Sequence, residues 1–146
     1  MVEGVLLTRL EIVSATGGAV LKAMKGDDPG ASGFGEAYFS IVEKGAVKAW
    51  KRHRKMTLNL IVPCGEIRFV IYDDRPESRT CGSHEEVRLS LRNYQRLTIP
   101  PMLWMGFQGG SEQLNMLLNL ADMAHDPAEA DRLDPREIAF DWSSYL

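Results

Sequence analysis

The stretch Gly45–Arg75, GAVKAWKRHRKMTLNLIVPCGEIRFVIYDDR, decides the fold. It contains a basic segment, 48–55, followed by two apolar runs, 58–62 and 67–72, which have the length of buried β-strands. Pro63-Cys64-Gly65-Glu66 separates the two runs. Proline and glycine favour turns, so these four residues predict a tight connection between paired strands.

The basic segment also predicts which side chains share a face. Successive side chains of a strand point to opposite sides. One face is therefore expected to carry Ala49, Lys51 and His53, and the other Lys48, Trp50 and Arg52. A strand that directs a lysine and a histidine the same way is a candidate for proton transfer.

The rest of the chain supports an all-β fold. Apolar residues alternate with polar ones, or form short runs, over 4–13, 34–42, 87–91, 97–99 and 103–107. Glycine, proline and asparagine separate these segments, which recur about every ten residues. Short strands at such intervals indicate a β-sandwich or barrel.

Two segments near the C-terminus look helical by propensity. Residues 113–123 place leucines at helical spacing and contain no β-branched residue. Asp126-Pro127-Ala128-Glu129 is typical of a helix start, and the predicted helix ends at Leu133, before Asp134-Pro135. The aromatic residues of the following tail, 138–142, are expected to pack against the body.

Composition limits the possible partners. The 146 residues are expected to form one domain, 1–146, with 45% hydrophobic residues and a net charge of −3. This charge argues against a general affinity for nucleic acid but permits a local basic pocket. Cys64 and Cys81 are interpreted as reduced thiols of a cytoplasmic protein, and no apolar run has the length of a membrane span.

Four segments, in the same order, resemble the RmlC-like cupins of the dTDP-4-dehydrorhamnose 3,5-epimerase family. Residues 45–51 are similar to the GvxRGxH strand of that family, and 72–82 to its vDxRxxSxTxG motif. Residues 93–107 are similar to NxxxLxIPxGxxHGF, and 126–142 to YxPxxE, DP and a closing tryptophan.

The resemblance implies an all-β cupin jelly roll, or double-stranded β-helix, with a short C-terminal helix and an active site inside the barrel. It implies a strand rather than a helix over 113–123. It also implies a homodimer that binds a dTDP-sugar and needs no cofactor.

The resemblance implies a catalytic mechanism from which this chain departs. Members remove a proton next to a ketone with a histidine, which a carboxylate orients, and return a proton from a tyrosine on the other face. Here Lys51 stands in place of that histidine, and Leu58 and Met105 replace a lysine and a second histidine. The region before Asp126 contains no tyrosine, and Asp134 is the candidate carboxylate.

Three residues are candidates for the missing chemistry. His53 is the better base, because its ordinary pKa is near neutrality and the related 3,4-ketoisomerases carry an HxH pair on this strand. Lys51 is a base only if burial or neighbouring cations lower its pKa. His125 is a candidate proton donor. The alternative is that Lys51 and His53 lie on a solvated basic surface and that His125 helps to cap the helix at Asp126.

Four residues are candidates for substrate binding. Lys48 and Arg75 suit a diphosphate, although Arg75 follows two aspartates and could instead form an ion pair. Trp104 could stack on a base or fill the core, and Asn59 could line the cavity or lie outside it. A metal site is not expected, because His53 has no companion ligands in the motifs.

The sequence therefore supports two functions. The favoured one is an epimerase or isomerase that acts on a dTDP-4-keto-6-deoxy sugar in bacterial polysaccharide or deoxysugar synthesis, by proton transfer next to the ketone. The alternative is a catalytically silent cupin that binds a sugar nucleotide or another small anion.

Overall fold

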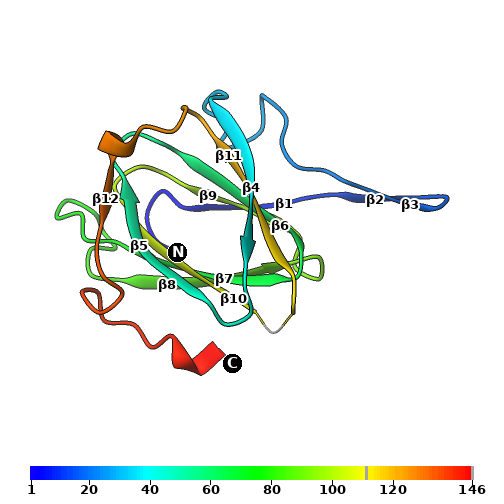
Figure 1. Cartoon of the computed structure of the whole chain (residues 1–146). Helices are drawn as coiled ribbons and strands as arrows, with labels where there is room; N and C mark the ends of the chain where they lie inside the picture. The colour runs from blue at the N-terminus through cyan, green and yellow to red at the C-terminus, as the bar shows by residue number, and fades with distance from the viewer. Residues whose placement is uncertain (111, 146) are drawn as a thin grey trace.

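A computed structural model describes residues 1–110 and 112–145 and shows two antiparallel five-stranded sheets that face each other (Figure 1). The first sheet has the order β1 (Leu6–Arg9), β9 (Gln95–Ile99), β6 (Leu58–Cys64), β11 (Asn115–Ala121), β4 (Glu36–Val42). The second has the order β12 (Ala130–Arg132), β5 (Val47–His53), β10 (Trp104–Gly109), β7 (Glu66–Tyr72), β8 (His84–Ser90). The predicted jelly roll is confirmed.

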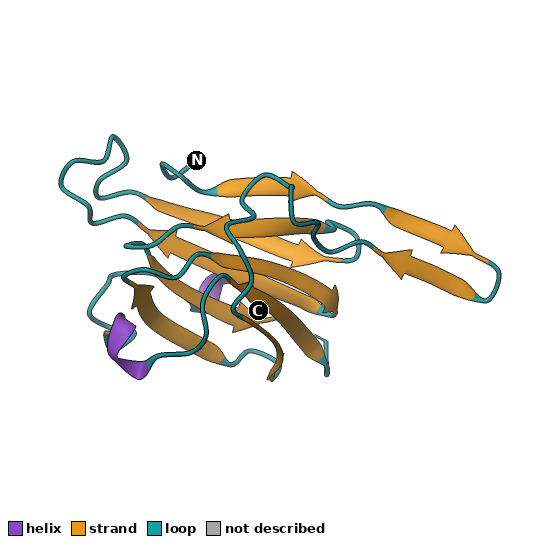
Figure 2. Cartoon of the chain, turned by 90° about the horizontal axis from the view of Figure 1, so that it is seen from above, coloured by secondary structure: helices purple, strands orange, loops and turns teal. Residues whose placement is uncertain are grey.

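A separate hairpin projects from this body. It consists of β2 (Ile12–Ala15) and β3 (Gly18–Leu21), which pair only with each other (Figure 1). Viewed from above, the hairpin extends well beyond the two sheets (Figure 2). It leaves Ile12, Val13 and Val20 exposed.

The connection after Pro63 differs from its prediction. β6 and β7 do not pair with each other, because β6 lies in the first sheet and β7 in the second. Gly65, with a φ of +74°, makes the turn that carries the chain between the sheets. Both strands are buried on both faces, which explains why their apolar runs are continuous rather than alternating.

The core lies between the sheets, and a second cluster lies outside. The inner cluster includes Leu60, Phe69 and Leu97, and each such side chain contributes about 1.5–3 kcal/mol when fully buried. The outer cluster is covered by the C-terminal tail, where the rings of Trp142 and Trp50 have centroids 5.4 Å apart. The expected packing of the tail aromatics is confirmed.

The segment with helical spacing is strand β11. Its residues alternate between buried and half-buried, and it pairs with β4 on one side and β6 on the other. Two complete neighbours satisfy its backbone, which outweighs the helical propensity of its leucines. The strand implied by the family resemblance is confirmed.

The predicted C-terminal helix is present only as one 3-10 turn. Asp126 accepts a hydrogen bond from the Ala128 amide at 2.9 Å, and Pro127 opens the turn η1 (Pro127–Glu129). The chain then becomes β12, because Ala130–Arg132 pairs with the end of β5. A second short turn, η2 (Ser143–Tyr145), ends the described chain. No helix within the described residues is long and apolar enough to cross a membrane.

A buried ion pair fixes the loop after β7. Asp73 is fully buried and accepts hydrogen bonds from Arg75 at 2.8 Å, Ser78 at 2.5 Å and Thr80 at 2.6 Å. The Arg75 bond is the main cause of the strongly lowered pKa of Asp73. Arg75 also donates to the Glu3 carbonyl at 2.7 Å, which ties the N-terminus to this loop.

We expect Asp73→Asn to lower the free energy of unfolding by about 2 kcal/mol, because it removes charge-assisted hydrogen bonds from a buried group. Since the folded pKa lies below the unfolded value of about 3.9, this stabilisation is complete above about pH 5 and is lost progressively as the pH falls toward the folded pKa. Urea unfolding at pH 7 and pH 3 measures both effects. Arg79→Ala, at an exposed side chain, is the control; equal stability of Asp73→Asn and wild type at pH 7 would contradict this role.

Candidate active site

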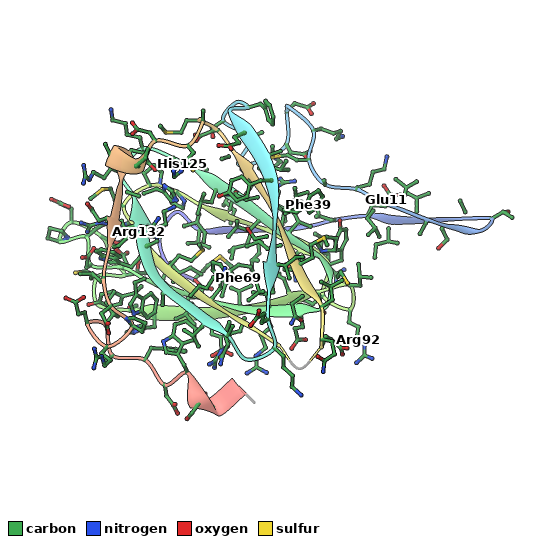
Figure 3. The ribbon with its side chains drawn as sticks, in the orientation of Figure 1. Glu11, Phe39, Phe69, Arg92, His125 and Arg132 are labelled. Carbon is green, nitrogen blue, oxygen red and sulfur yellow. The ribbon has the colours of Figure 1, made fainter. Side chains whose placement is uncertain are left out.

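A cavity of about 420 Å³ lies between the two sheets, at the end where β4 faces β5 and β12. One wall carries the predicted residues Lys48, Lys51 and His53, and Arg132 joins them from β12, which runs beside β5 (Figure 3). The opposite wall carries the polar residues Tyr38, Ser40 and Asn119. Apolar side chains complete the lining, among them Leu58, Leu60, Met105, Phe107 and Leu117.

An irregularity in β5 explains why Lys48 reaches this cavity. Lys51 pairs with Met105 of β10, but Lys48 pairs with Phe107, so three residues of β5 span two of β10. Such a bulge inserts one residue and reverses the alternation beyond it. Lys48 therefore shares a face with Lys51 and His53, whereas strict alternation predicts the opposite face.

Burial increases from the rim of the cavity inward. Lys48 and Arg132 are exposed, Lys51 is half-buried, and His53 is only 8% exposed. Among the described residues, none of the three cations has an ion-pair partner. The cavity therefore presents uncompensated positive charge to a ligand, with an imidazole beyond it.

His53 is held by a carboxylate. Its Nδ1 is hydrogen-bonded to Oε1 of Glu129, which is itself buried. The other carboxylate oxygen accepts the backbone amides of Arg54, Lys55 and Met56 at 3.1–3.3 Å. Ala130 pairs with His53, which places the preceding Glu129 against the ring. With Nδ1 occupied, Nε2 is the nitrogen left for the cavity.

The electrostatics favour a neutral imidazole and an ionised glutamate. Burial lowers the pKa of His53, although the hydrogen bond to Glu129 acts in the opposite direction. Burial alone would raise the pKa of Glu129, but the bonds from His53 and from the backbone amides lower it. A neutral imidazole that donates Nδ1–H to a carboxylate has its Nε2 lone pair free to accept a proton.

A phenol lies on the opposite wall. Asn119 donates a hydrogen bond from Nδ2 to the hydroxyl oxygen of Tyr38 at 2.8 Å. Because the phenol oxygen accepts this bond, its own hydrogen is free for a ligand in the cavity. Asn119 Oδ1 is buried without a hydrogen-bond partner. The family resemblance places the catalytic tyrosine just before Asp126, whereas this phenol belongs to Tyr38 of β4.

Three predicted substrate-binding residues lie elsewhere. Asn59 is buried on the outer side of β6, where it bonds Thr98, Arg96 and the Gly30 carbonyl. Trp104 is buried on the outer face of the second sheet; its Nε1 donates to Asp74 at 2.8 Å, and Arg52 lies over its ring. Arg75 pairs with Asp73. The sequence also allowed each residue a structural role: a place outside the cavity for Asn59, in the core for Trp104 and in an ion pair for Arg75. The contacts of all three fit that role.

Two predicted catalytic residues also lie outside the cavity lining. Asp134 is exposed and pairs with Arg136 at 2.9 Å, so the carboxylate beside the histidine is Glu129 instead. His125 lies in the exposed loop before η1, where its backbone amide donates to Glu36 (Figure 3). Glu129 lies close to the glutamate of YxPxxE but one residue short of it, two rather than three residues after Pro127; Tyr38 and Arg132 had no comparable motif.

Over the described part of the chain, no group of three or more histidine, cysteine, aspartate or glutamate side chains is arranged to hold an ion. The reactive groups of the cavity are instead those of general acid–base chemistry: an imidazole on a carboxylate, a phenol and an amine.

A jelly-roll barrel whose cavity holds an imidazole on a carboxylate, a phenol and an amine has the groups needed to move protons on a bound small molecule. The sequence matches the family described as dTDP-4-dehydrorhamnose 3,5-epimerase over residues 2–146, and the chain belongs to that family. The chain therefore belongs to the sugar-nucleotide epimerases and isomerases.

Similar proteins agree with this assignment. A crystal structure of a dTDP sugar isomerase from Desulfovibrio desulfuricans G20 is 41% identical, covers 97% of this chain and 92% of its own, and has a TM-score of 0.93. A probable low-salt glycan biosynthesis epimerase, Agl13 of Haloferax volcanii, is 30% identical over 75% of this chain and 74% of its own. The spore coat polysaccharide biosynthesis protein SpsL of Bacillus subtilis is 26% identical over 99% and 98%.

The contact of Glu129 with His53 predicts the effect of Glu129→Gln. The three amides bind Oε2, so the oxygen of the new amide stays there and its NH₂ group faces Nδ1. That donor selects the tautomer with a proton on Nε2, which cannot act as a base. We expect proton exchange on a ketosugar substrate to fall about 10²- to 10⁴-fold.

The control for this variant is Asp131→Asn, since the Asp131 carboxylate contacts Arg52 and Arg54 rather than His53. It is expected to exchange at close to the wild-type rate. Circular dichroism checks that both variants fold. A folded Glu129→Gln protein with wild-type exchange would show that the carboxylate does not set the tautomer.

Proposed function

We propose that the protein epimerises or isomerises a dTDP-4-keto-6-deoxy sugar by proton transfer next to the ketone, with His53 as the base. The observation that carries this proposal is the His53–Glu129 pair in a cavity lined by unpaired cations. The similarity to a dTDP sugar isomerase supports the substrate class.

The charges of the cavity suit such a substrate. Lys48 and Arg132 are exposed at the rim, where they can bind the diphosphate by charge-assisted hydrogen bonds. The sugar then extends inward past Lys51 to His53. Apart from Tyr38, Ser40 and Asn119, the remaining lining is apolar, as expected for the face of a 6-deoxy sugar.

Epimerisation requires protons on both faces of the reacting carbon. His53 lies on the second sheet and Tyr38 on the first, so the two groups approach a bound sugar from opposite walls. The Asn119 bond to the phenol oxygen orients Tyr38 and would stabilise its phenolate after the proton is given up. Tyr38 thus replaces the family tyrosine that this chain lacks near Asp126.

Other properties of the chain support two finer proposals. A homodimer is supported by the exposed apolar residues of the projecting hairpin and of edge strand β4, which include Val20, Phe39 and Ile41. A cytoplasmic location is supported by the free thiols Cys64 and Cys81. The absence of nucleic-acid partners and of a cofactor stays a prediction.

The test of the function is deuterium entry from D₂O at C3 and C5 of a dTDP-4-keto-6-deoxy sugar. Wild-type protein is expected to catalyse exchange, and His53→Asn to lower its rate at least about 100-fold. Because burial lowers the pKa of His53, the rate should fall on the acid side with an apparent pKa below 6.5.

Equal exchange by His53→Asn and wild type would exclude His53 as the base, and a wild-type rate no greater than that of buffer alone would contradict an enzymatic function. If the wild-type protein nevertheless binds dTDP, measured by calorimetry, the alternative of a silent nucleotide-binding cupin would be correct. If it does neither, both functions fail.

Tyr38→Phe separates proton removal from proton return. We expect this variant to exchange deuterium within about tenfold of the wild-type rate, because His53 is unchanged, but to lose inversion of configuration. The readout is the ratio of inverted to exchanged product, measured by NMR. Phe39→Tyr, which changes an exposed neighbour on the outer face of β4, is the control. An unchanged ratio in Tyr38→Phe would exclude the phenol as the second acid.

A further inference from the structure

Lys51 is the cavity residue that base chemistry by His53 does not use. It is half-buried on β5, two residues before His53, and pairs with Met105 on one side and Arg132 on the other. Two residues along a strand span about 7 Å, so a flexible lysine can reach an atom adjacent to the one at the imidazole. Its ammonium has no ion-pair partner among the described residues.

The surroundings of Lys51 lower its pKa and so make proton loss from the amine easier. Burial is the main cause of its lowered pKa, and the positive charge of Arg132 acts in the same direction. Glu129 opposes the shift, but its charge is already engaged by His53 and three backbone amides. An amine desolvated in an apolar pocket next to a second cation is the environment in which lysines react with carbonyl groups.

We propose that Lys51 forms a Schiff base with the ketone of the sugar, so that His53 removes its proton from an iminium rather than from a ketone. This inference rests on the proposed function, since it needs a ketosugar in the cavity. It makes Lys51 a covalent catalytic residue at the position where the family histidine is missing.

The reaction balances without any further reactant. The Lys51 nitrogen adds to the carbonyl carbon, and the carbonyl oxygen leaves as water, with a proton from solvent completing the iminium. His53 Nε2 takes the proton from the neighbouring carbon, and the electron pair moves into the C–C bond to give a neutral enamine. Reprotonation of that carbon restores the iminium, and one water molecule hydrolyses it to the ketone and the amine, which returns the proton to solvent.

An iminium removes the need to stabilise negative charge on the ketone oxygen. Removing a proton next to a ketone creates negative charge on oxygen, which must be stabilised in place. Here the apolar side chain of Leu58 lines the cavity, at the position where the resemblance implies a lysine. A cationic iminium accepts the electron pair internally, so the charge is neutralised without a separate donor to the oxygen.

Reductive trapping tests the Schiff base. The protein is incubated with a dTDP-4-keto-6-deoxy sugar and cyanoborohydride, and the intact mass and peptide map are measured. We expect one adduct, with the substrate mass less one oxygen atom, on Lys51. His53→Asn should keep the adduct, because it blocks only the later proton transfer. Lys51→Arg should lose it, whereas Lys44→Arg, at an exposed lysine outside the cavity, should trap like the wild type.

Oxygen exchange provides a second measurement. Schiff-base formation and hydrolysis replace the ketone oxygen with oxygen from solvent, so wild-type protein in H₂¹⁸O should label the ketone faster than buffer alone. Lys51→Arg keeps a positive charge but cannot form the bond, and we expect it to label at the buffer rate and to lose at least about 100-fold in deuterium exchange.

The outcomes separate the two proposals. Wild-type deuterium exchange without an adduct and without ¹⁸O entry would overturn the Schiff base and leave the isomerase function standing, with Lys51 acting through its charge. Lys51→Arg with near wild-type exchange would overturn it as well. No deuterium exchange in the wild type would instead contradict the proposed function itself.

Discussion

A buried carboxylate must be paired or heavily hydrogen-bonded, and the satisfaction of Glu129 determines how the end of this chain folds. Three consecutive backbone amides after β5 donate to one of its oxygens, and His53 to the other. To bring the glutamate there, the chain turns once at η1 and then adds β12 to the edge of the sheet. The same pairing brings Arg132 beside Lys51. A single buried charge therefore explains why the predicted helix is cut to one turn, why the sheet gains a strand and why the imidazole has one tautomer.

The sequence predicts the scaffold better than the site, for physical reasons. The alternation and the apolar runs of a strand follow from which of its side chains are buried, and every residue of the strand contributes to that pattern. The strands predicted over 34–42, 58–62 and 67–72 are therefore correct. Which strand pairs with which is decided by long-range packing, and the tight turn after Pro63 joins opposite sheets rather than neighbours. The helical spacing of 113–123 fails for the same reason. The family resemblance identifies β11 correctly because it carries long-range information that propensity lacks.

The composition of the site depends on features that the alternation of side chains along a strand does not predict. Lys51 and His53 are found because they lie two apart on one strand, but Lys48 reaches the cavity through a bulge opposite Met105 and Phe107. Arg75, Trp104 and Asn59 are plausible ligands by type, yet each is satisfied by protein partners once the chain is folded. Polar residues that remain unpaired in the structure, rather than polar residues that are present in the sequence, mark the binding surface. Arg132 belongs to this group, and the Tyr38–Asn119 pair lines the same cavity; none of the three carries a motif.

The lysine at position 51, where the resemblance implies a histidine, gives the cavity a different set of reactive groups and is compatible with catalysis. A base at His53 needs only its carboxylate partner, and Glu129 lies one residue before β12, the strand that pairs directly with β5. An amine beside it would be a poor substitute for a histidine base, because neutralising it already requires burial and the charge of Arg132. Those same conditions make it a good nucleophile toward a carbonyl. In the two proposals, base and electrophilic activation are divided between His53 and Lys51 on one face of β5, while the phenol of Tyr38 on β4 completes the opposite wall.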